Sequence, residues 1–161
     1  MVITADHLTM RNTPARLITC LLALLVAVEP AFAYDPIGTW YTARNRAQVR
    51  IAHCGRDTLC GVIVWLKDPK DPKTGKPWND INNVDPTKRA RPLIGVRIVL
   101  DLTQSNSSNK WRGQVYNADD GRTYSGYLTM TGADALELKG CVLGGIICRS
   151  ETWKRAARAL P

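Results

Sequence analysis

Turn-forming residues divide the chain between residues 37 and 155 into short segments, and this spacing limits the possible folds more than any other feature. The segments between the turns have strand character, and none of them keeps the 3.6-residue period of a helix. The pattern therefore predicts an all-β domain of eight strands. The expected strands span residues 37–43, 47–54, 59–66, 93–103, 110–117, 122–131, 135–142 and 147–155.

Segment 93–103 shows the clearest alternation of apolar and polar residues. Successive side chains of a strand point to opposite faces, so one face of this strand is expected to be dry. Arg97 and Asp101 would lie on the other face. The residues expected on the dry face are Ile94, Val96, Ile98, Leu100 and Leu102.

Four cysteines outside the N-terminal segment are placed symmetrically around two turns. If Gly144-Gly145 is a two-residue hairpin turn, Cys141 lies directly opposite Cys148, and such residues have Cα atoms close enough for a disulfide. Cys54 and Cys60 flank a second turn in the same way. We therefore predict the disulfides Cys54–Cys60 and Cys141–Cys148. Neither pair has the C-x-x-C spacing of a redox-active dithiol.

Eight consecutive antiparallel strands with tight turns favour a closed up-and-down barrel, with a two-sheet sandwich as the alternative. Asp120-Gly121 indicates a type I′ hairpin in this series. The first and last strands of such a barrel are neighbours, so an arginine can stack on an indole, a contact worth about 0.5–2 kcal/mol. The residues expected to close this end of the barrel are Gly38, Trp40, Trp153 and Arg155.

Residues 1–33 have the layout of a secretory signal peptide. Basic residues precede a charge-free apolar run over 17–28, and Ala31-Phe32-Ala33 offers small residues at the cleavage positions. The run is too short to cross about 30 Å of hydrocarbon. We expect cleavage after Ala33 and export to the periplasm or the medium as a single domain, residues 34–161. Translation is expected to start at Met10, because the residues before it add nothing that a signal needs.

The net charge of +8 favours anionic surroundings such as envelope glycans, lipid head groups or acidic ligands, although it also serves solubility. Nucleic acid is an unsuitable partner for an exported protein. Outside the signal the number of cysteines is even, as in disulfide-bonded exported domains.

Residues 67–92 form a proline-rich loop with interleaved lysines, longer than most connections without a function. Its oxygen-bearing side chains could indicate calcium, but the loop lacks the glutamate and the central glycine typical of calcium loops. The simpler interpretation is a set of Asx turns in which an aspartate pairs with an arginine. We therefore expect no metal and no cofactor. The residues that define this loop motif are Asp80, Asn82, Asn83, Asp85, Arg89 and Arg91.

Motifs of catalysis are missing from the sequence. After the signal there is one histidine, His53, and no partner for it as an acid or base is recognisable. No nucleophile elbow, P-loop or H-E-x-x-H motif occurs. We expect a protein without a catalysed reaction.

Short motifs along the chain resemble two related families. Gly38-Thr39-Trp40 is similar to the G-x-W signature of the lipocalins (calycins), whose barrels hold small apolar ligands. Over nearly the whole exported part, the chain resembles the bacterial domain-of-unknown-function family 2147 (DUF2147). The resemblance implies a lipocalin-like barrel in the cell envelope, and it does not imply a catalysed reaction. The matching stretches are residues 38–40, 60–66, 80–86, 91–95, 111–117, 120–124, 140–141 and 152–155.

These observations lead to the hypothesis of an exported protein that binds a small amphipathic molecule with an acidic head, such as a fatty acid. An eight-stranded barrel is just wide enough for one small ligand. Lys88, Arg89 and Arg91 would face the acidic head beside the long loop. The residues expected to line the interior and the mouth are Trp65, Trp78, Ile94, Val96, Ile98, Leu100, Tyr116 and Tyr124.

The alternative is a non-catalytic envelope module that docks on an anionic partner through its basic loop. The barrel would then be filled by its own side chains. The sequence leaves the ligand's identity and the oligomeric state open.

Overall fold

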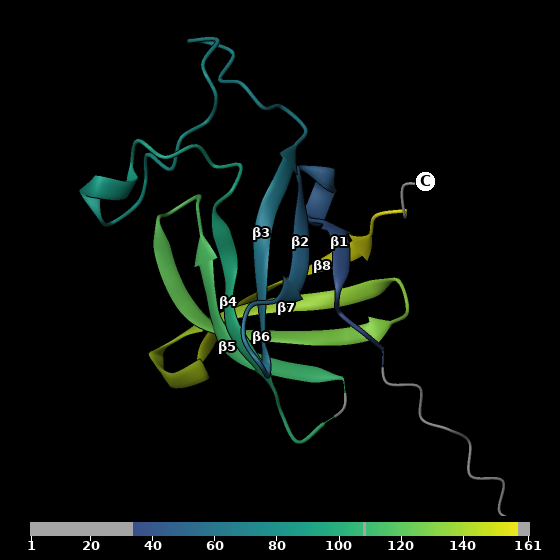
Figure 1. Ribbon diagram of the computed structural model, residues 1–161. Helices are drawn as coiled ribbons and strands as arrows, with labels where there is room; N and C mark the ends of the chain where they lie inside the picture. Colours follow the sequence, from purple (N-terminus) through teal and green to yellow (C-terminus); the bar gives the residue numbers. More distant parts are fainter. Residues whose placement is uncertain (1–33, 108, 158–161) are drawn as a thin grey trace, which may run out of the picture. The chain divides into compact units, whose positions relative to one another are not determined.

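A computed structural model describes residues 34–107 and 109–157, and these place every strand beside its neighbour in sequence. The series closes into a barrel because β1 also pairs with β8, with Trp40 opposite Arg155 (Figure 1). The strands are β1 (Gly38–Tyr41), β2 (Ala47–His53), β3 (Thr58–Leu66), β4 (Arg97–Gln104), β5 (Lys110–Asn117), β6 (Arg122–Gly132), β7 (Ala135–Val142) and β8 (Ile147–Arg155). The predicted eight-stranded barrel is confirmed, and the sandwich alternative is wrong.

The connections between strands contain three short 3₁₀ turns: η1 (Ala43–Asn45), η2 (Pro86–Lys88) and η3 (Leu143–Gly145). Among the described residues, no helix is long and apolar enough to cross a membrane. The expected signal peptide, its cleavage site and the expected start at Met10 lie outside the described residues.

One end of the barrel is packed around two tryptophans. Trp40 is fully buried and donates its indole N–H to the carbonyl oxygen of Pro36 at 2.8 Å, and Trp153 is buried beside it in the core. The guanidinium of Arg155 lies 4.1 Å from the ring centroid of Trp40. Its three nitrogens donate to the carbonyl oxygens of Asp35, Ile37 and Ala133. Arg155 therefore ties the entering chain and the β6–β7 turn to this end, which we call the floor.

The dry face predicted for segment 93–103 is only partly correct. The buried residues there are Val96, Val99 and Leu102, spaced by three, whereas Ile94 is 47% exposed and precedes the strand. The register shifts where β4 meets β3 and again where it meets β5. Each inserted residue turns the following side chain to the other face, so the alternation in the sequence does not survive.

The same correction applies to Ile98 and Leu100, which are only partly buried against the core. They flank the fully buried Val99, which pairs with Val115 of β5. Within β4, at the register shift against β5, Asp101 adopts a φ of 48°, which marks the local departure from a regular strand.

Two hairpin loops are longer than predicted. The β7–β8 connection runs from Leu143 to Ile146 through η3 and not through a two-residue turn, but Cys141 still faces Cys148. The β5–β6 connection also spans four residues, and among them only Gly121 has a positive φ, so the type I′ turn is wrong. The β7–β8 loop keeps the predicted register because it lengthens symmetrically, whereas in the β5–β6 hairpin Asn117 lies opposite Arg122, which is not the pairing of a two-residue turn at Asp120-Gly121.

The structure contains two disulfides, Cys54–Cys60 and Cys141–Cys148, the pairs that the spacing predicts. Their Cα atoms are 5.7 Å and 4.1 Å apart, respectively. Each bridge joins the strands that flank one hairpin and therefore fixes the register there.

Candidate functional site

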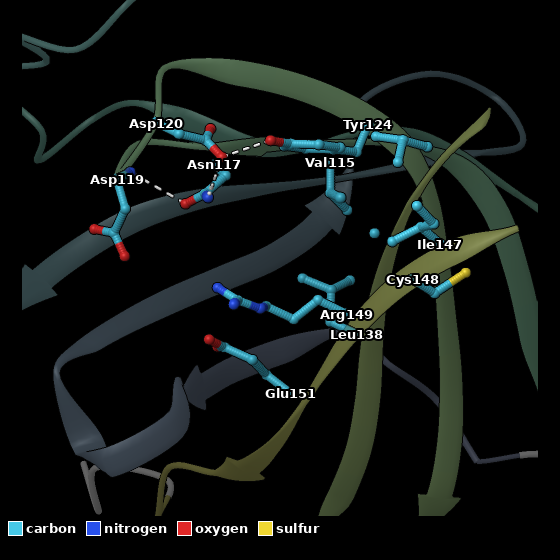
Figure 2. Close-up of a pocket in the computed structure, with 12 residues that line it drawn as sticks. Val115, Asn117, Asp119, Asp120, Tyr124, Leu138, Ile147, Cys148, Arg149 and Glu151 are labelled. Carbon is cyan, nitrogen blue, oxygen red and sulfur yellow. Dashed lines mark hydrogen bonds between the residues drawn. The ribbon is translucent and has the colours of Figure 1, made fainter. Parts of the chain in front are cut away.

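An open cup lies in the barrel at the end opposite the floor, on the inner faces of β5 to β8. Along β8 the inner face carries Ile147, Arg149, Glu151 and Trp153 in turn, because side chains alternate between faces. Trp153 belongs to the core, and the three residues before it line the cup. The cavity has a volume of about 560 Å³ and opens to solvent (Figure 2).

The residues that line the cup come from four strands and the β5–β6 loop, and they are Val115, Asn117, Asp119, Asp120, Tyr124, Leu138, Gly140, Val142, Ile147, Cys148, Arg149 and Glu151. Below the cup, the barrel is filled by its own side chains. Leu128, Met130 and Leu136 are buried against Trp40 and Trp153. The barrel is thus packed at the floor and hollow only towards its mouth.

Polar groups at the rim of the cup are partly paired with one another. Asp120 accepts hydrogen bonds from the hydroxyl of Tyr124 at 2.5 Å and from Asn117 Nδ2 at 3.0 Å. The hydrogen bond with Asp120, more than burial, raises the pKa of Tyr124. Asp119 forms an exposed ion pair with Arg46 at 3.3 Å. These contacts hold the β5–β6 loop and leave its carboxylates at the rim.

Two charged groups lie deeper on the β8 side of the cup. Glu151 Oε2 accepts a 3.4 Å hydrogen bond from the indole N–H of Trp153, which links the cup to the packed floor. Arg149 lines the cup and is exposed, and within the described part of the chain its guanidinium has no hydrogen bond or ion pair. Arg149 is therefore a cation that is available to a ligand.

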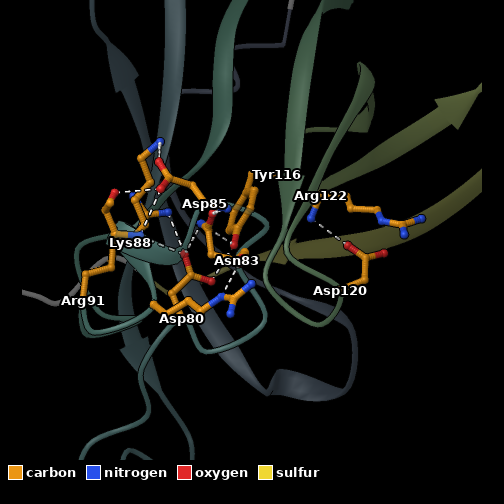
Figure 3. A network of polar contacts seen from close by, with 10 residues as sticks. Asp80, Asn83, Asp85, Lys88, Arg91, Tyr116, Asp120 and Arg122 are labelled. Atoms are coloured by element: carbon orange, nitrogen blue, oxygen red, sulfur yellow. Dashed lines mark hydrogen bonds and ion pairs between the residues drawn. The ribbon is translucent and has the colours of Figure 1, made fainter.

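A buried polar network fixes the long loop between β3 and β4 (Figure 3). Asp80 is fully buried, and its Oδ1 accepts a 2.5 Å hydrogen bond from the hydroxyl of Tyr116. Its Oδ2 accepts hydrogen bonds from Asn83 Nδ2 at 2.7 Å and from two nitrogens of Arg91 at 2.7 and 2.9 Å. Both carboxylate oxygens are therefore occupied by donors.

The network shifts the pKa values of its members in opposite directions. Burial alone would raise the pKa of Asp80, but the hydrogen bonds from Tyr116, Asn83 and Arg91 together hold it below its ordinary value. Burial, and then the hydrogen bond with Asp80, raise the pKa of Tyr116 to about 12. At neutral pH the network is therefore a carboxylate held by a phenol, an amide and a guanidinium.

The loop also contacts the β5–β6 hairpin that borders the cup. Asn82 Nδ2 donates to the carbonyl oxygen of Asp119 at 3.1 Å, and the backbone N–H of Val84 donates to that of Gly121 at 3.3 Å. Gly121 has a φ of 71°, and a Cβ atom there would lie 1.7 Å from the carbonyl oxygen of Asn82. Only glycine fits at this position, where residues 82–84 of the loop lie against the β5–β6 hairpin. The contact attaches the loop to the wall of the cup.

The loop residues chosen from the sequence do lie together, and the pairing of an aspartate with an arginine occurs between Asp80 and Arg91. Arg89 donates to the carbonyl oxygen of Asn83 at 2.8 Å. Hydrogen bonds from Thr87 and then from Lys88 lower the pKa of Asp85 to about 2.

The residues predicted to line the ligand site are scattered, and among them Tyr124 lines the cup. Trp65 is on the outer surface, edge-on to Tyr41 at a centroid distance of 6.2 Å. Tyr116 belongs to the buried network, and Trp78 lies in the loop, where its backbone pairs with Pro69 and Leu93. Just before β4, Val96 is in the packed core and Ile94 lies away from the cup, as do Ile98 and Leu100 on β4 itself.

The sequence does not single out most cup residues, because the alternation in segment 93–103 places the expected ligand site beside β4. The signal that could have found them is the alternation in β8. Counting back by twos from Trp153, which the sequence already placed at the floor, gives Glu151, Arg149 and Ile147 on the same face.

The sulfurs of Cys54 and Cys60 lie 3.6 Å and 3.4 Å from Oδ1 of Asp101. This trio has the residue types of a metal site, but zinc and similar ions bind thiolates, and the two cysteines are joined in a disulfide. It carries no metal-binding role in this state.

Comparisons with known proteins agree with the barrel fold. The family model described as "Uncharacterized protein conserved in bacteria (DUF2147)" matches residues 38–155. A search of curated proteins finds no match. Among solved structures, the barrel is similar to protein HP1028 from the human pathogen Helicobacter pylori, which is described as belonging to the lipocalin family. That match has 22% sequence identity and a TM-score of 0.63, and it covers 77% of this chain and 84% of the other.

Proposed function

The chain belongs to the bacterial DUF2147 family, and from this premise and its lipocalin-like barrel we propose that it binds a small amphipathic ligand in the cup. The single observation that carries the proposal is the cup itself, a cavity of about 560 Å³ at the mouth of a barrel that is packed elsewhere. Pockets for small molecules commonly have about 300–1,000 Å³ and combine apolar walls with a few polar groups.

The walls of the cup suit the apolar part of such a ligand. Val115, Leu138 and Ile147 present aliphatic side chains from three strands. The packed residues below the cup limit its depth. A ligand would therefore bind with its apolar part against these walls and its polar head towards the rim.

The ligand's head group is proposed to be acidic, with Arg149 as its partner. A guanidinium can hold a carboxylate through two parallel hydrogen bonds. The loop cations suggested by the sequence are less suitable, because Arg91 is bound to Asp80, and Lys88 to Asp85 at 3.0 Å. Arg89 is bound to the carbonyl oxygen of Asn83. The carboxylates of Glu151 and Asp120 would repel a second acidic group on the ligand, so ligands with two acidic groups would bind more weakly.

The protein is further proposed to act outside the cytoplasm, after cleavage behind Ala33. Two disulfides are typical of an oxidising, exported environment, which supports this location. The intact mass of the secreted protein should correspond to a chain that begins at Tyr34. A mass that corresponds to a chain still carrying residues 1–33 would contradict the proposed cleavage.

The proposed head-group contact is tested by titrating dansyl-labelled undecanoic acid into the wild type and into Arg149→Gln. Loss of the charged partner should weaken binding at least about tenfold, because a hydrogen bond to a charged group contributes about 1.5–3 kcal/mol. The matched control is Arg50→Gln on the exposed outer part of β2, which should bind as the wild type does.

Equal binding by Arg149→Gln and the wild type would contradict the role of Arg149. Failure of the wild type to bind, combined with salt-sensitive association with the envelope, would favour the alternative of a docking module. Surface charges are screened over about 8–10 Å at moderate ionic strength, so that association should weaken with salt.

A further inference from the structure

The tip of the β7–β8 hairpin, residues 142–147, exposes a cluster of aliphatic side chains. Leu143 is 69% exposed and Ile146 is 83% exposed, and Val142 and Ile147 beside them are also exposed. Between Cys141 and Cys148 there is no polar side chain. Figure 1 shows η3 projecting beyond the strands that carry it. Exposed apolar groups gathered in one place mark interaction sites more often than single ones do.

The tip is held in this exposed conformation. The Cys141–Cys148 disulfide closes its base, with Cα atoms 4.1 Å apart. Within it, Leu143 has a φ of 51°, a left-handed conformation that costs an ordinary side chain energy and that glycine or asparagine adopts more easily. The chain thus keeps a leucine at a position where both the backbone and the solvent disfavour it.

The charges next to the tip in the sequence indicate what covers it. Residues 139–150 contain two cations, Lys139 and Arg149, and no acidic residue. Lys139 pairs with Glu137 at 3.6 Å, whereas Arg149 has no partner among the described residues. An aliphatic tip beside a free cation, in a protein of net charge +8, is complementary to an anionic lipid surface.

We propose that this tip is a membrane-docking element that inserts its aliphatic side chains into the interface of an anionic bilayer. A lipid surface fits better than a protein partner, because the tip offers no polar or aromatic side chain to recognise one, and such anchors dominate protein interfaces. Val142 and Ile147 also line the cup. Docking would therefore bring the cup's mouth to the lipid surface, although the docking itself does not require a ligand.

The test is flotation of the delipidated protein with vesicles of phosphatidylcholine, with and without phosphatidylglycerol. The variant combines Leu143→Asn with Ile146→Ser, and asparagine accepts the left-handed conformation, so the hairpin should fold. We expect the wild type to float with the anionic vesicles and the variant to partition at least about tenfold less. The control Tyr34→Ser removes an exposed aromatic side chain near the floor and should float as the wild type does.

Three results would overturn the proposal. The double variant could float as well as the wild type, or the wild type could float with neither kind of vesicle. The third is a concentration-dependent dimer in sedimentation that the double variant abolishes, without vesicle binding, since the tip would then contact a second copy of the chain. Titration of dansyl-labelled undecanoic acid into Arg149→Gln tests the cup, whereas flotation of the Leu143→Asn, Ile146→Ser variant tests the tip, so the two proposals can fail separately.

Discussion

Replacing Asp80 with asparagine is expected to lower the free energy of unfolding by about 3 kcal/mol at neutral pH. Tyr116 donates to one carboxylate oxygen, while Asn83 and Arg91 donate to the other. An amide has a single oxygen, so one of these donors must face an NH₂ group in either orientation of the new side chain. Arg91 also loses its ion partner.

The pH dependence gives this prediction a second readout. The pKa of Asp80 is depressed in the folded protein, so its contribution to stability is present above the ordinary aspartate pKa, near 4, and is lost as the pH falls through the lower folded value. The stability difference between the wild type and Asp80→Asn should therefore shrink in acid. Asp85, whose pKa is also lowered, is present in both proteins and cancels.

Urea unfolding between pH 2 and pH 7 measures both effects. The control Asp119→Asn removes an exposed ion pair with Arg46 and should change stability by less than about 1 kcal/mol. A difference for Asp80→Asn that is small at pH 7, or that grows as the pH falls, would show that the network does not stabilise the loop as described.

Replacing Trp40 with alanine is expected to cost about 4 kcal/mol, the largest effect of a single substitution predicted for this chain. The indole is fully buried in the floor, and its removal leaves a cavity among well-packed side chains. The substitution also leaves the carbonyl oxygen of Pro36 without its hydrogen-bond donor and removes the ring that lies against the guanidinium of Arg155.

Thermal unfolding followed by circular dichroism measures this loss, with Trp65→Ala as the matched control. Trp65 is 39% exposed on the outer surface, so the same substitution should cost much less there. If the two alanine variants melted at similar temperatures, Trp40 would not be the centre of a packed floor.

The sequence predicted those parts of the fold that depend on local spacing. Hairpin register follows from residues close in the chain, so Cys141 faces Cys148 although the loop is two residues longer than expected. Closure of the barrel followed from the number of strands. The face of a β4 residue, by contrast, depends on bulges against β3 and β5, and these arise from packing between strands that the local alternation does not report.

In the candidate site, too, a contact within one loop could be predicted from the sequence, whereas contacts that depend on distant strands could not. Asp80 and Arg91 are eleven residues apart in one loop, and their pairing could be predicted from residue type. The phenol of Tyr116 reaches the same carboxylate from β5, at a separation of 36 residues, and nothing in the local sequence indicates it. Arg149 was overlooked for a related reason, since its position in the cup depends on which face of β8 points inward.

The central claim is that the cup at the barrel mouth, and not the packed floor, holds the ligand. It is tested most directly by titrating dansyl-labelled undecanoic acid into Leu138→Trp, which fills the cup from β7. We predict that this variant melts near the wild-type temperature and binds at least about tenfold more weakly, because the indole occupies the apolar wall. The control Thr152→Trp, on an exposed outer position of β8, should bind normally. Undiminished binding by Leu138→Trp would contradict the account.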